Sequence, residues 1–252
     1  MTPELELQHS RTLLLPELEV DQIERLQTSE VWVIGLGGLG TAASLYLASS
    51  GVGRLHLVDG DQIDASNLPR QILYGQADLG RPKAEVAAER LRSLNPNAQI
   101  SSHTQMAQRD WLESALQSAS LVLDCTDRFV SRQSINEVCL RLQIPLVIAS
   151  VVRWEGQLLA CGPSLRAQGC YTCTFPLVND ASGSSAVDAA CGAFGVFPSM
   201  AGVMATLQAQ EALKLLLGLH PEPDLLMLQG PSLELIRIQR RRDTNCPACK
   251  GA

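Results

Sequence analysis

Short apolar segments alternate with longer amphipathic ones along the first 150 residues. Runs of strand length occupy residues 31–34, 54–58, 121–123 and 146–151. Such runs are typical of strands buried on both faces of a parallel sheet. Helical patterns lie between them, at residues 20–27 (opened by Asp21), 38–50, 82–94, 111–117 and 129–142, with a further strand near 99–101. The alternation predicts an α/β fold with a Rossmann-like, doubly wound and mostly parallel sheet.

The last third of the chain has a different pattern. Strands are predicted at 157–161, 225–228 and 233–238, and these need not be parallel. A long helix is predicted over 198–217, and the small, polar stretch 178–190 is predicted to be a mobile loop. Neither an internal repeat nor a linker is evident, so we expect one domain spanning residues 1–252.

A glycine-rich loop follows the first strand. Gly35-Leu-Gly-Gly-Leu-Gly40 fits the pattern G-x-G-x-x-G between a strand and a helix, with candidate contacts at Gly35, Gly37, Gly38 and Gly40. Glycines allow main-chain N–H groups to approach phosphate at the positive end of a helix. Asp59 comes 19 residues after Gly40, at the end of the next strand, where it can accept hydrogen bonds from ribose. The loop therefore indicates a nucleotide but does not distinguish NAD from ATP.

A polar stretch beyond Asp59 favours ATP. It carries cations and amides that can bind and neutralise a triphosphate, for which a dinucleotide dehydrogenase has no need. We predict nucleotide contacts at Asp61, Ser66, Asn67, Arg70, Gln71 and Lys83.

The sequence Asp124-Cys-Thr-Asp127 ends another predicted strand at the same edge of the sheet. A carboxylate there can hold Mg²⁺, which prefers oxygen ligands and bridges phosphates. The alternative is that one of these aspartates caps the following helix. Asp124 fits both interpretations equally, and Asp127 favours the metal.

Eight cysteines occur in a chain that carries no recognisable secretory signal. Two CxxC pairs, 72 residues apart, have the spacing of a four-thiolate zinc site formed by Cys170, Cys173, Cys246 and Cys249. We expect Cys125, Cys139 and Cys161 to be buried. Cys191 follows the polar stretch, where a reactive thiol could be exposed.

Composition excludes some functions. The net charge of −6 disfavours nonspecific nucleic-acid binding. The basic run Arg237, Arg240, Arg241 and Arg242 is expected to be a solvated strand end, with contact to an acidic partner as the alternative. No apolar stretch reaches the roughly 18 residues of a membrane span. We therefore expect a cytoplasmic protein without membrane or nucleic-acid partners.

With these motifs in order, the chain resembles the ThiF/MoeB/HesA family, bacterial relatives of ubiquitin-activating enzymes, from about Gln8 to Lys250. The resemblance implies ATP-dependent adenylation of the C-terminal glycine of a small ubiquitin-like sulfur-carrier protein that ends in Gly-Gly. ATP would bind in the glycine loop, with its phosphates at Asn67, Arg70, Gln71 and Lys83, and Asp127 would position magnesium.

The resemblance also implies a homodimer in which Arg11 reaches the partner's active site. It places Cys191 where the thiamine branch has a cysteine that bonds covalently to the carrier, and it leaves a sulfurtransferase as a further partner. Arg128, a candidate nucleotide contact, stands where the family usually has Asn.

Three functions stay open at this point. A ThiS-like carrier of thiamine biosynthesis is favoured over a MoaD-like carrier of molybdopterin biosynthesis. An NAD-linked oxidoreductase would leave Arg70, Lys83 and the cysteine pairs without a role. A catalytically silent, zinc-stabilised binding protein would retain the fold alone.

Overall fold

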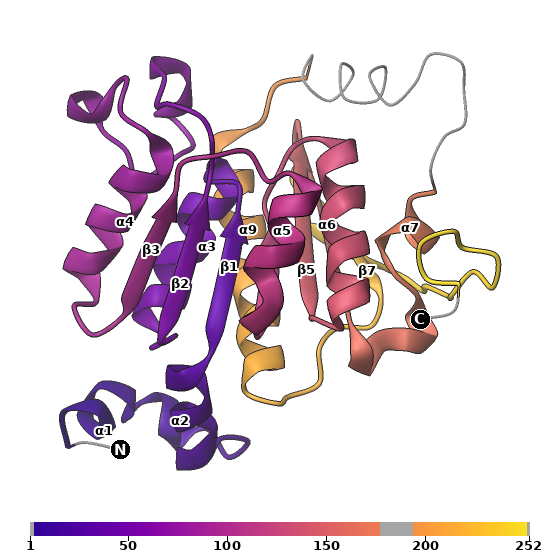
Figure 1. Cartoon of the computed structure of the whole chain (residues 1–252), viewed down its shortest axis with the longest axis horizontal. Helices are drawn as coiled ribbons and strands as arrows, with labels where there is room; N and C mark the ends of the chain where they lie inside the picture. The colour runs from indigo at the N-terminus through magenta and orange to yellow at the C-terminus, as the bar shows by residue number, and fades with distance from the viewer. Residues whose placement is uncertain (1–2, 177–193, 251–252) are drawn as a thin grey trace.

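The computed structural model describes residues 3–176 and 194–250 (Figure 1). Their strands form one sheet in the order β3-β2-β1-β4-β5-β6-β7-β8. The strands are β1 (Glu30–Ile34), β2 (Arg54–Val58), β3 (Gln99–His103), β4 (Leu121–Asp124), β5 (Leu146–Val152), β6 (Glu155–Cys161), β7 (Leu225–Gln229) and β8 (Glu234–Ile238).

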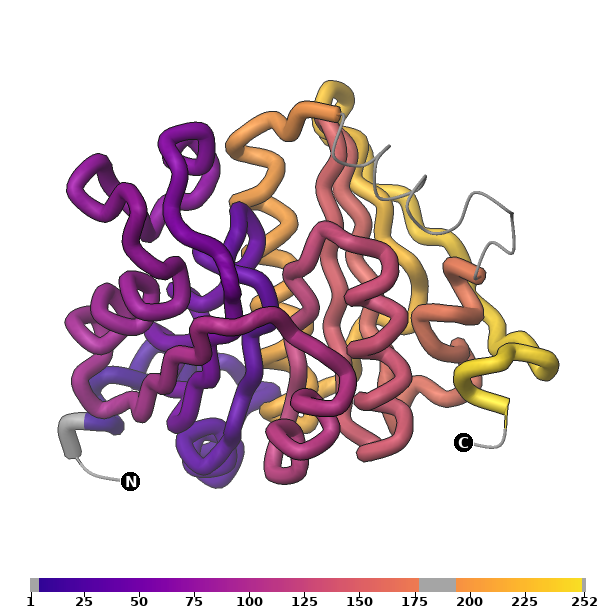
Figure 2. The backbone as a smooth tube through the Cα atoms, turned by 45° about the horizontal axis from the view of Figure 1, so that its top comes forward, coloured from indigo at the N-terminus to yellow at the C-terminus, as the bar shows by residue number. Residues whose placement is uncertain are grey.

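The sheet is parallel from β3 to β5 and antiparallel from β5 to β8. The predicted doubly wound sheet, extended by the C-terminal strands, is therefore confirmed. Figure 2 shows β5 to β8 continuing the sheet beyond the parallel half.

The main helices cover both faces of the sheet. They are α1 (Pro3–His9), α2 (Val20–Thr28), α3 (Gly38–Ser49), α4 (Lys83–Leu94), α5 (Arg109–Ala115), α6 (Phe129–Leu142), α7 (Tyr171–Thr174) and α9 (Pro198–Leu216). Short 3-10 turns are η1 (Thr12–Leu14), η2 (Ala65–Asn67), η3 (Gln76–Asp78), η4 (Leu116–Ser118) and η5 (Pro163–Gln168).

Successive side chains of β1 point to opposite faces of the sheet, and each face has its own hydrophobic core. Val31 and Val33 belong to the core that contains α3, α4 and α9. Trp32 and Ile34 point to the other core, beneath α5 and α6. Figure 1 shows α5 and α6 in front of the sheet and α3 and α9 behind it. All five residues of β1 are buried because helices cover both faces, which is why its sequence is almost continuously apolar.

One sequence-based detail was wrong. The helix at 20–27 is not opened by Asp21: its N-cap is Glu19, whose main-chain N–H donates to the Gln22 side chain (2.8 Å). The helix predicted near 111–117 is confirmed, with α5 beginning at Arg109 and the 3-10 turn η4 following it. The predicted loop at 178–190 lies outside the described residues.

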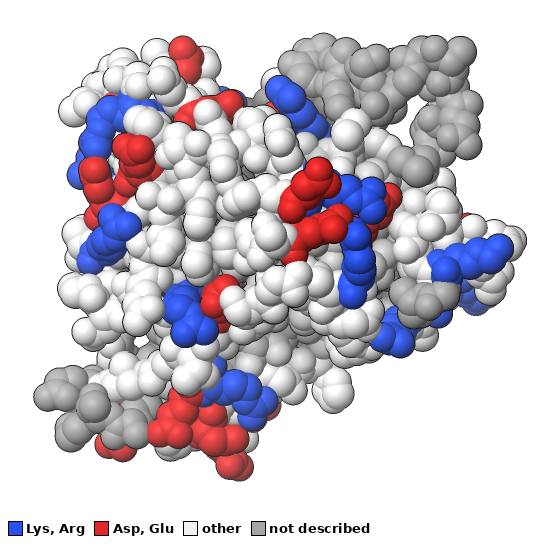
Figure 3. All heavy atoms as spheres, in the orientation of Figure 1, with Lys and Arg blue, Asp and Glu red and all other residues white. Residues whose placement is uncertain are grey.

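The basic run after β8 is not uniformly solvated. Arg240 is 6% exposed and donates to the carbonyl oxygens of Ala160 (2.6 Å) and Pro223 (2.9 Å). Its guanidinium is therefore a structural group that joins the end of the chain to β6. Elsewhere, on the face in Figure 3, positive side chains are interspersed with negative ones.

None of the described helices is long and apolar enough to cross a membrane.

Candidate active site

The glycine loop joins β1 to α3 at the carboxyl edge of the sheet. Gly35 has φ +90°, and a Cβ there would lie 2.8 Å from the Cys125 carbonyl oxygen. A Cβ on Gly40 would lie only 1.9 Å from the oxygen of Gly35. A side chain at either position would separate the loop from the strands beside it. The glycines therefore keep the amino end of α3 against the sheet, where its unpaired N–H groups face the edge.

Asp59 ties this loop to the end of β2. Its Oδ2 accepts the main-chain N–H of Leu36 (2.7 Å), and its Oδ1 accepts that of Asp61 (2.8 Å). Burial raises the pKa of the Asp59 carboxyl, while the Lys83 charge acts in the opposite direction. The carboxylate thus has a fixed orientation before any nucleotide binds.

Two cations stand beyond Asp59. Arg70 donates from Nη1 to the Ser66 carbonyl oxygen (2.8 Å), which orients its guanidinium. Lys83 begins α4, is 6% exposed and places Nζ 3.1 Å from Oδ2 of Asp61. A buried ammonium group needs a partner, and Asp61 supplies it.

Gln71 lies beneath the loop rather than in solvent. Its side chain is 3% exposed, and its Oε1 has no hydrogen-bond partner among the described residues. A Cβ on Gly37 would be 3.8 Å from Gln71 Nε2. Buried polar atoms usually have partners, so this unpaired oxygen indicates a group that can accept from a ligand at the loop.

Asp124 does not cap the following helix, which was one of its two predicted roles. Its side chain is fully buried, and its Oδ1 accepts from the N–H (2.9 Å) and hydroxyl (2.7 Å) of Thr126. The N-cap of α6 is Arg128, so Asp124 does not cap that helix, and its Oδ2 is buried without a hydrogen-bond partner among the described residues. Burial also raises the pKa of the Asp124 carboxyl. By contrast, Asp127 is exposed at the cavity wall.

These groups surround one cavity of about 1020 Å³. The predicted residues that line it are Gly35, Gly37, Gly38, Asp59, Asp61, Asn67, Arg70, Gln71, Lys83, Asp127 and Arg128. Gly40 and Ser66 are outside the lining and act on the loop and on Arg70 instead. Arg11 is exposed, lies outside the lining and follows α1 in the sequence. Figure 1 shows α1 at the end of the sheet away from its carboxyl edge. Cys191 lies outside the described residues.

The sequence reasoning missed the far wall of the cavity. Gln105, Met106 and Ala107 follow β3, and Gln157, Phe194 and Val196 come from the C-terminal half. Arg132, also missed, donates from Nε to the Thr126 carbonyl oxygen (3.1 Å). The position of 105–107 directly after a strand of this edge was a usable signal, whereas residues 194–196 reach the cavity only through tertiary folding.

The four predicted metal-ligand cysteines meet at the C-terminal end of the chain. Their Sγ atoms all lie within 4.8 Å of one another, with 3.9 Å between Cys170 and Cys173, 3.8 Å between Cys170 and Cys246, and 3.5 Å between Cys173 and Cys249. Zn–S bonds of about 2.3 Å in a tetrahedron require S···S separations of about 3.8 Å. This group of residues, called the cysteine cluster below, could therefore hold a metal.

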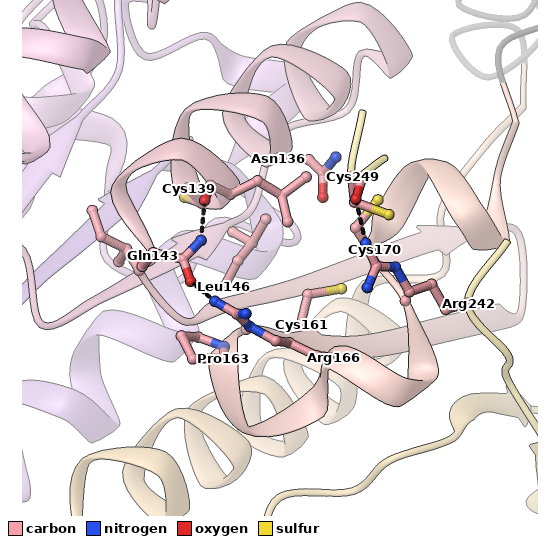
Figure 4. Close-up of a pocket in the computed structure, with 14 residues that line it drawn as sticks. Asn136, Cys139, Gln143, Leu146, Cys161, Pro163, Arg166, Cys170, Arg242 and Cys249 are labelled. Atoms are coloured by element: carbon pink, nitrogen blue, oxygen red, sulfur yellow. Dashed lines mark hydrogen bonds between the residues drawn. The ribbon is translucent and has the colours of Figure 1, made fainter. Parts of the chain in front are cut away.

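A second cavity, of about 40 Å³, lies beside the cysteine cluster (Figure 4). Cys139 and Cys161 are on its wall, both buried as predicted, and Cys125 is buried elsewhere, in contact with Gln208. Burial raises the pKa of the Cys161 thiol to about 11, which makes it unreactive at neutral pH. The space accommodates a few water molecules at most, so the nucleotide-sized site is the large cavity.

The sequence model of the ThiF family matches residues 9–248. The chain belongs to the ThiF family. The match includes all residues that line the large cavity and three of the four cysteines of the cysteine cluster, Cys170, Cys173 and Cys246.

Several ThiF-type relatives are similar over nearly the whole chain. The sulfur carrier protein ThiS adenylyltransferase of Escherichia coli is 42% identical over 98% of this chain and 96% of its own length. The molybdopterin-synthase adenylyltransferase of the same organism is 35% identical, covering 96% of both chains. A mouse adenylyltransferase and sulfurtransferase, MOCS3, is 38% identical over 96% of this chain, which spans 52% of the mouse protein.

Solved structures are similar in fold. The E. coli MccB structure with ATP superposes with a TM-score of 0.84 at 24% identity, over 96% of this chain and 74% of MccB. At that identity the likeness supports the ThiF-type fold alone.

Proposed function

We propose that the chain is an ATP-dependent adenylyltransferase that acts on the C-terminal glycine carboxylate of a small ubiquitin-like sulfur-carrier protein. The observation that carries the proposal is that one cavity collects the glycine loop, Asp59, Arg70, Lys83 and Asp127. The 42% identity to a ThiS adenylyltransferase supports it. Small-molecule sites usually enclose about 300–1,000 Å³. The cavity is at the upper end of that range, so a carrier tail can enter beside the nucleotide.

The part of the cavity lined by the glycine loop and Asp59 fits a nucleotide. Phosphates are favoured at the amino end of α3 by its N–H groups and by the helix dipole. Each carboxylate oxygen of Asp59 accepts one main-chain N–H and retains further acceptor capacity. Ribose hydroxyls can therefore donate to Asp59 without displacing the loop.

The proposed reaction needs no proton transfer. A carboxylate oxygen of the carrier attacks the α-phosphorus of ATP and forms a new O–P bond. The bond from this phosphorus to the oxygen shared with the β-phosphate breaks, and its electron pair leaves with pyrophosphate. The nucleophile is already ionised, so the protein must supply orientation and positive charge. Arg70 and Lys83 supply that charge, and their bonds to Ser66 and Asp61 place them in advance.

Two metals belong to the proposal. Asp127 is exposed at the cavity and offers the oxygen ligands that Mg²⁺ prefers, and magnesium bound there would offset phosphate charge. Zn²⁺ is proposed in the cysteine cluster, because the sulfur separations match a tetrahedral site. Four protein ligands leave no open position, so zinc would stabilise the tail rather than take part in adenylation.

A ThiS-like carrier is preferred to a MoaD-like one, because the ThiS adenylyltransferase is 42% identical and the molybdopterin-synthase enzyme 35%. Cys191 is the proposed site of a covalent bond to the carrier, and a sulfurtransferase remains a proposed further partner.

Pyrophosphate–ATP exchange tests the function directly. Exchange should appear only when a carrier ending in Gly-Gly is present, and more strongly with a ThiS-type than with a MoaD-type carrier. Stronger exchange with MoaD-type carriers would reverse the choice of branch. ATP binding without exchange for any carrier would favour a silent binding protein, and binding of NADH but not ATP would favour the oxidoreductase.

A homodimer completed by Arg11 is proposed because Arg11 is exposed and lies away from its own cavity. Mixing inactive Arg11→Ala and Arg70→Ala proteins tests this. Mixed dimers contain one cavity with both arginines, so exchange activity should reappear. Arg25→Ala, another exposed arginine of the N-terminal region, should be active by itself. No recovery from exchanged dimers would contradict a role across the interface.

A further inference from the structure

Two imidazole rings are paired on β2 and β3, and the segment that follows β3 lines the large cavity. His56 Nδ1 lies 3.1 Å from His103 Nε2. The parallel register pairs His56 with Ser101, so His103, two residues further along β3, projects from the same face of the sheet. The pairing thus follows from the strand register and is not a chance contact of long side chains.

Tryptophans hold both rings in place. Trp32 stacks on His56 with ring centroids 4.1 Å apart and planes 6° from parallel, and on His103 at 5.0 Å. Trp111 of α5 lies against His103 at 5.5 Å. Neither imidazole can turn away without disturbing the packing between β1 and α5.

The backbone of His103 is part of the cavity's framework. Its carbonyl oxygen accepts the N–H of Asp59 (3.2 Å) and that of Gln105 (3.0 Å). Gln105, Met106 and Ala107 line the cavity. A Cβ on Gly60 would lie 2.7 Å from Met106 Sδ, so Met106 packs closely on the turn after Asp59. One residue therefore joins the proposed ribose carboxylate to the opposite wall.

We propose that His56 and His103 are positioning residues for nucleotide binding, and that their hydrogen bond makes this binding weaken in acid. The proposal rests on the proposed function only in that ATP occupies the large cavity.

The number of protons that the two imidazoles bind explains the acid dependence. One facing nitrogen must donate and the other must accept. A first added proton leaves that arrangement intact, since an imidazolium can donate to a neutral imidazole. A second proton puts N–H against N–H and breaks the bond. His103 would then move, together with the carbonyl group that holds Asp59 and Gln105.

Neighbouring charges favour protonation at His56 before His103. Glu30 Oε1 lies 3.7 Å from His56 Nε2 and also accepts from Trp32 and Ser118. Arg54 is paired with Glu30 and opposes a charge on His56. On the α4 side, Glu85 accepts from Thr104, next to His103.

The direction of the effect follows from burial, which lowers the pKa of both imidazoles from 6.5. Because the first proton leaves the pair intact, the paired arrangement is complete above that pH and is lost only as pH falls through the second protonation, well below it. Nucleotide affinity should follow the same direction.

The test compares ATP affinity by calorimetry from about pH 7.5 to about pH 4.5, a range that extends below the ordinary histidine titration because only the second proton breaks the pair. His103→Gln keeps a nitrogen near the position of Nε2 but cannot become charged. It should bind ATP at the higher pH within about twofold of the unaltered chain and lose about threefold less affinity on acidification. The titration of ATP itself is common to both proteins and cancels in this comparison.

Two more variants make the result decisive. His220→Gln, at an exposed histidine, should keep the full pH response. His103→Leu should weaken ATP binding at every pH while its Tm, measured in parallel, identifies any general loss of folding. Equal pH responses for His103→Gln and the unaltered chain would overturn the proposal. Failure of every protein to bind ATP would instead count against the proposed function.

Discussion

The carboxyl edge of the sheet that carries the glycine loop and Asp59, called the nucleotide edge below, and the cysteine cluster are held in place by different interactions. At the nucleotide edge, main-chain bonds cross from strand to strand: Gly35 donates to the Val58 carbonyl (2.8 Å), and Asp59 to that of His103 (3.2 Å). At the cluster, residues 243–250 form no helix or strand, and they are held by local turn bonds such as that from Cys246 N–H to the Asp243 oxygen (3.1 Å), by the four thiols and by Arg242. Figure 1 shows this tail at the margin of the sheet.

This difference separates function from stability. At the nucleotide edge the Asp59 side chain is part of the framework, whereas the Arg70 side chain is not. Side chains of the cysteine cluster hold the tail in place. Substitution of Arg70 should therefore reduce activity and leave folding unchanged, and substitution in the cysteine cluster should do the reverse.

The largest expected effect is at Arg70. Arg70→Ala should lower carrier-dependent pyrophosphate exchange by about 10²–10³-fold, the usual cost of removing a preplaced charge-stabilising donor. Its Tm should not change, because the bond from Arg70 to the Ser66 carbonyl is on a partly exposed turn. A fall in the Tm of Arg70→Ala that accounts for its loss of activity would contradict the proposed difference between the two regions.

Cys249→Ser should have the opposite signature. Serine is a poor zinc ligand, and a loss of roughly 3 kcal/mol corresponds to a Tm about 6–12 °C lower for a chain of this size. Bound zinc, measured by emission spectrometry, should fall, while ATP affinity of the folded fraction stays within about twofold. Cys139→Ala, at a buried thiol outside the cluster, is the control that should retain zinc. Normal zinc content in Cys249→Ser would refute the four-thiolate site.

The smallest effect is expected at Arg240, which joins the last strand to β6. Arg240→Ala leaves the buried carbonyl group of Ala160 and the partly exposed one of Pro223 without their donor, at a cost of about 1–3 kcal/mol in denaturant unfolding. Arg237→Ala removes only an exposed pair with Glu222 and should change stability by less than about 0.5 kcal/mol. Equal effects of the two substitutions would contradict the structural role of Arg240.

Local patterns predicted the glycine loop and the charged groups of the candidate site, but not its far wall. Glycines between a buried strand and a helix, and Asp59 at the next strand end, needed only periodicity and main-chain sterics. Asp124 was ambiguous because a strand-end carboxylate can point to solvent or into the core. Its burial against Thr126 depends on how β4 packs under α6 and α9, which spacing along the chain does not encode.

Residue type and short-range spacing were enough to predict the α/β alternation, the glycine loop and the grouping of the four cysteines. Tertiary structure decided that Asp124 is a buried turn anchor and that Arg240 is internal. It also decided that His56 and His103 meet beneath Trp32 on neighbouring strands. Strand register and burial bring these groups together from distant parts of the chain, and both are properties of the assembled sheet.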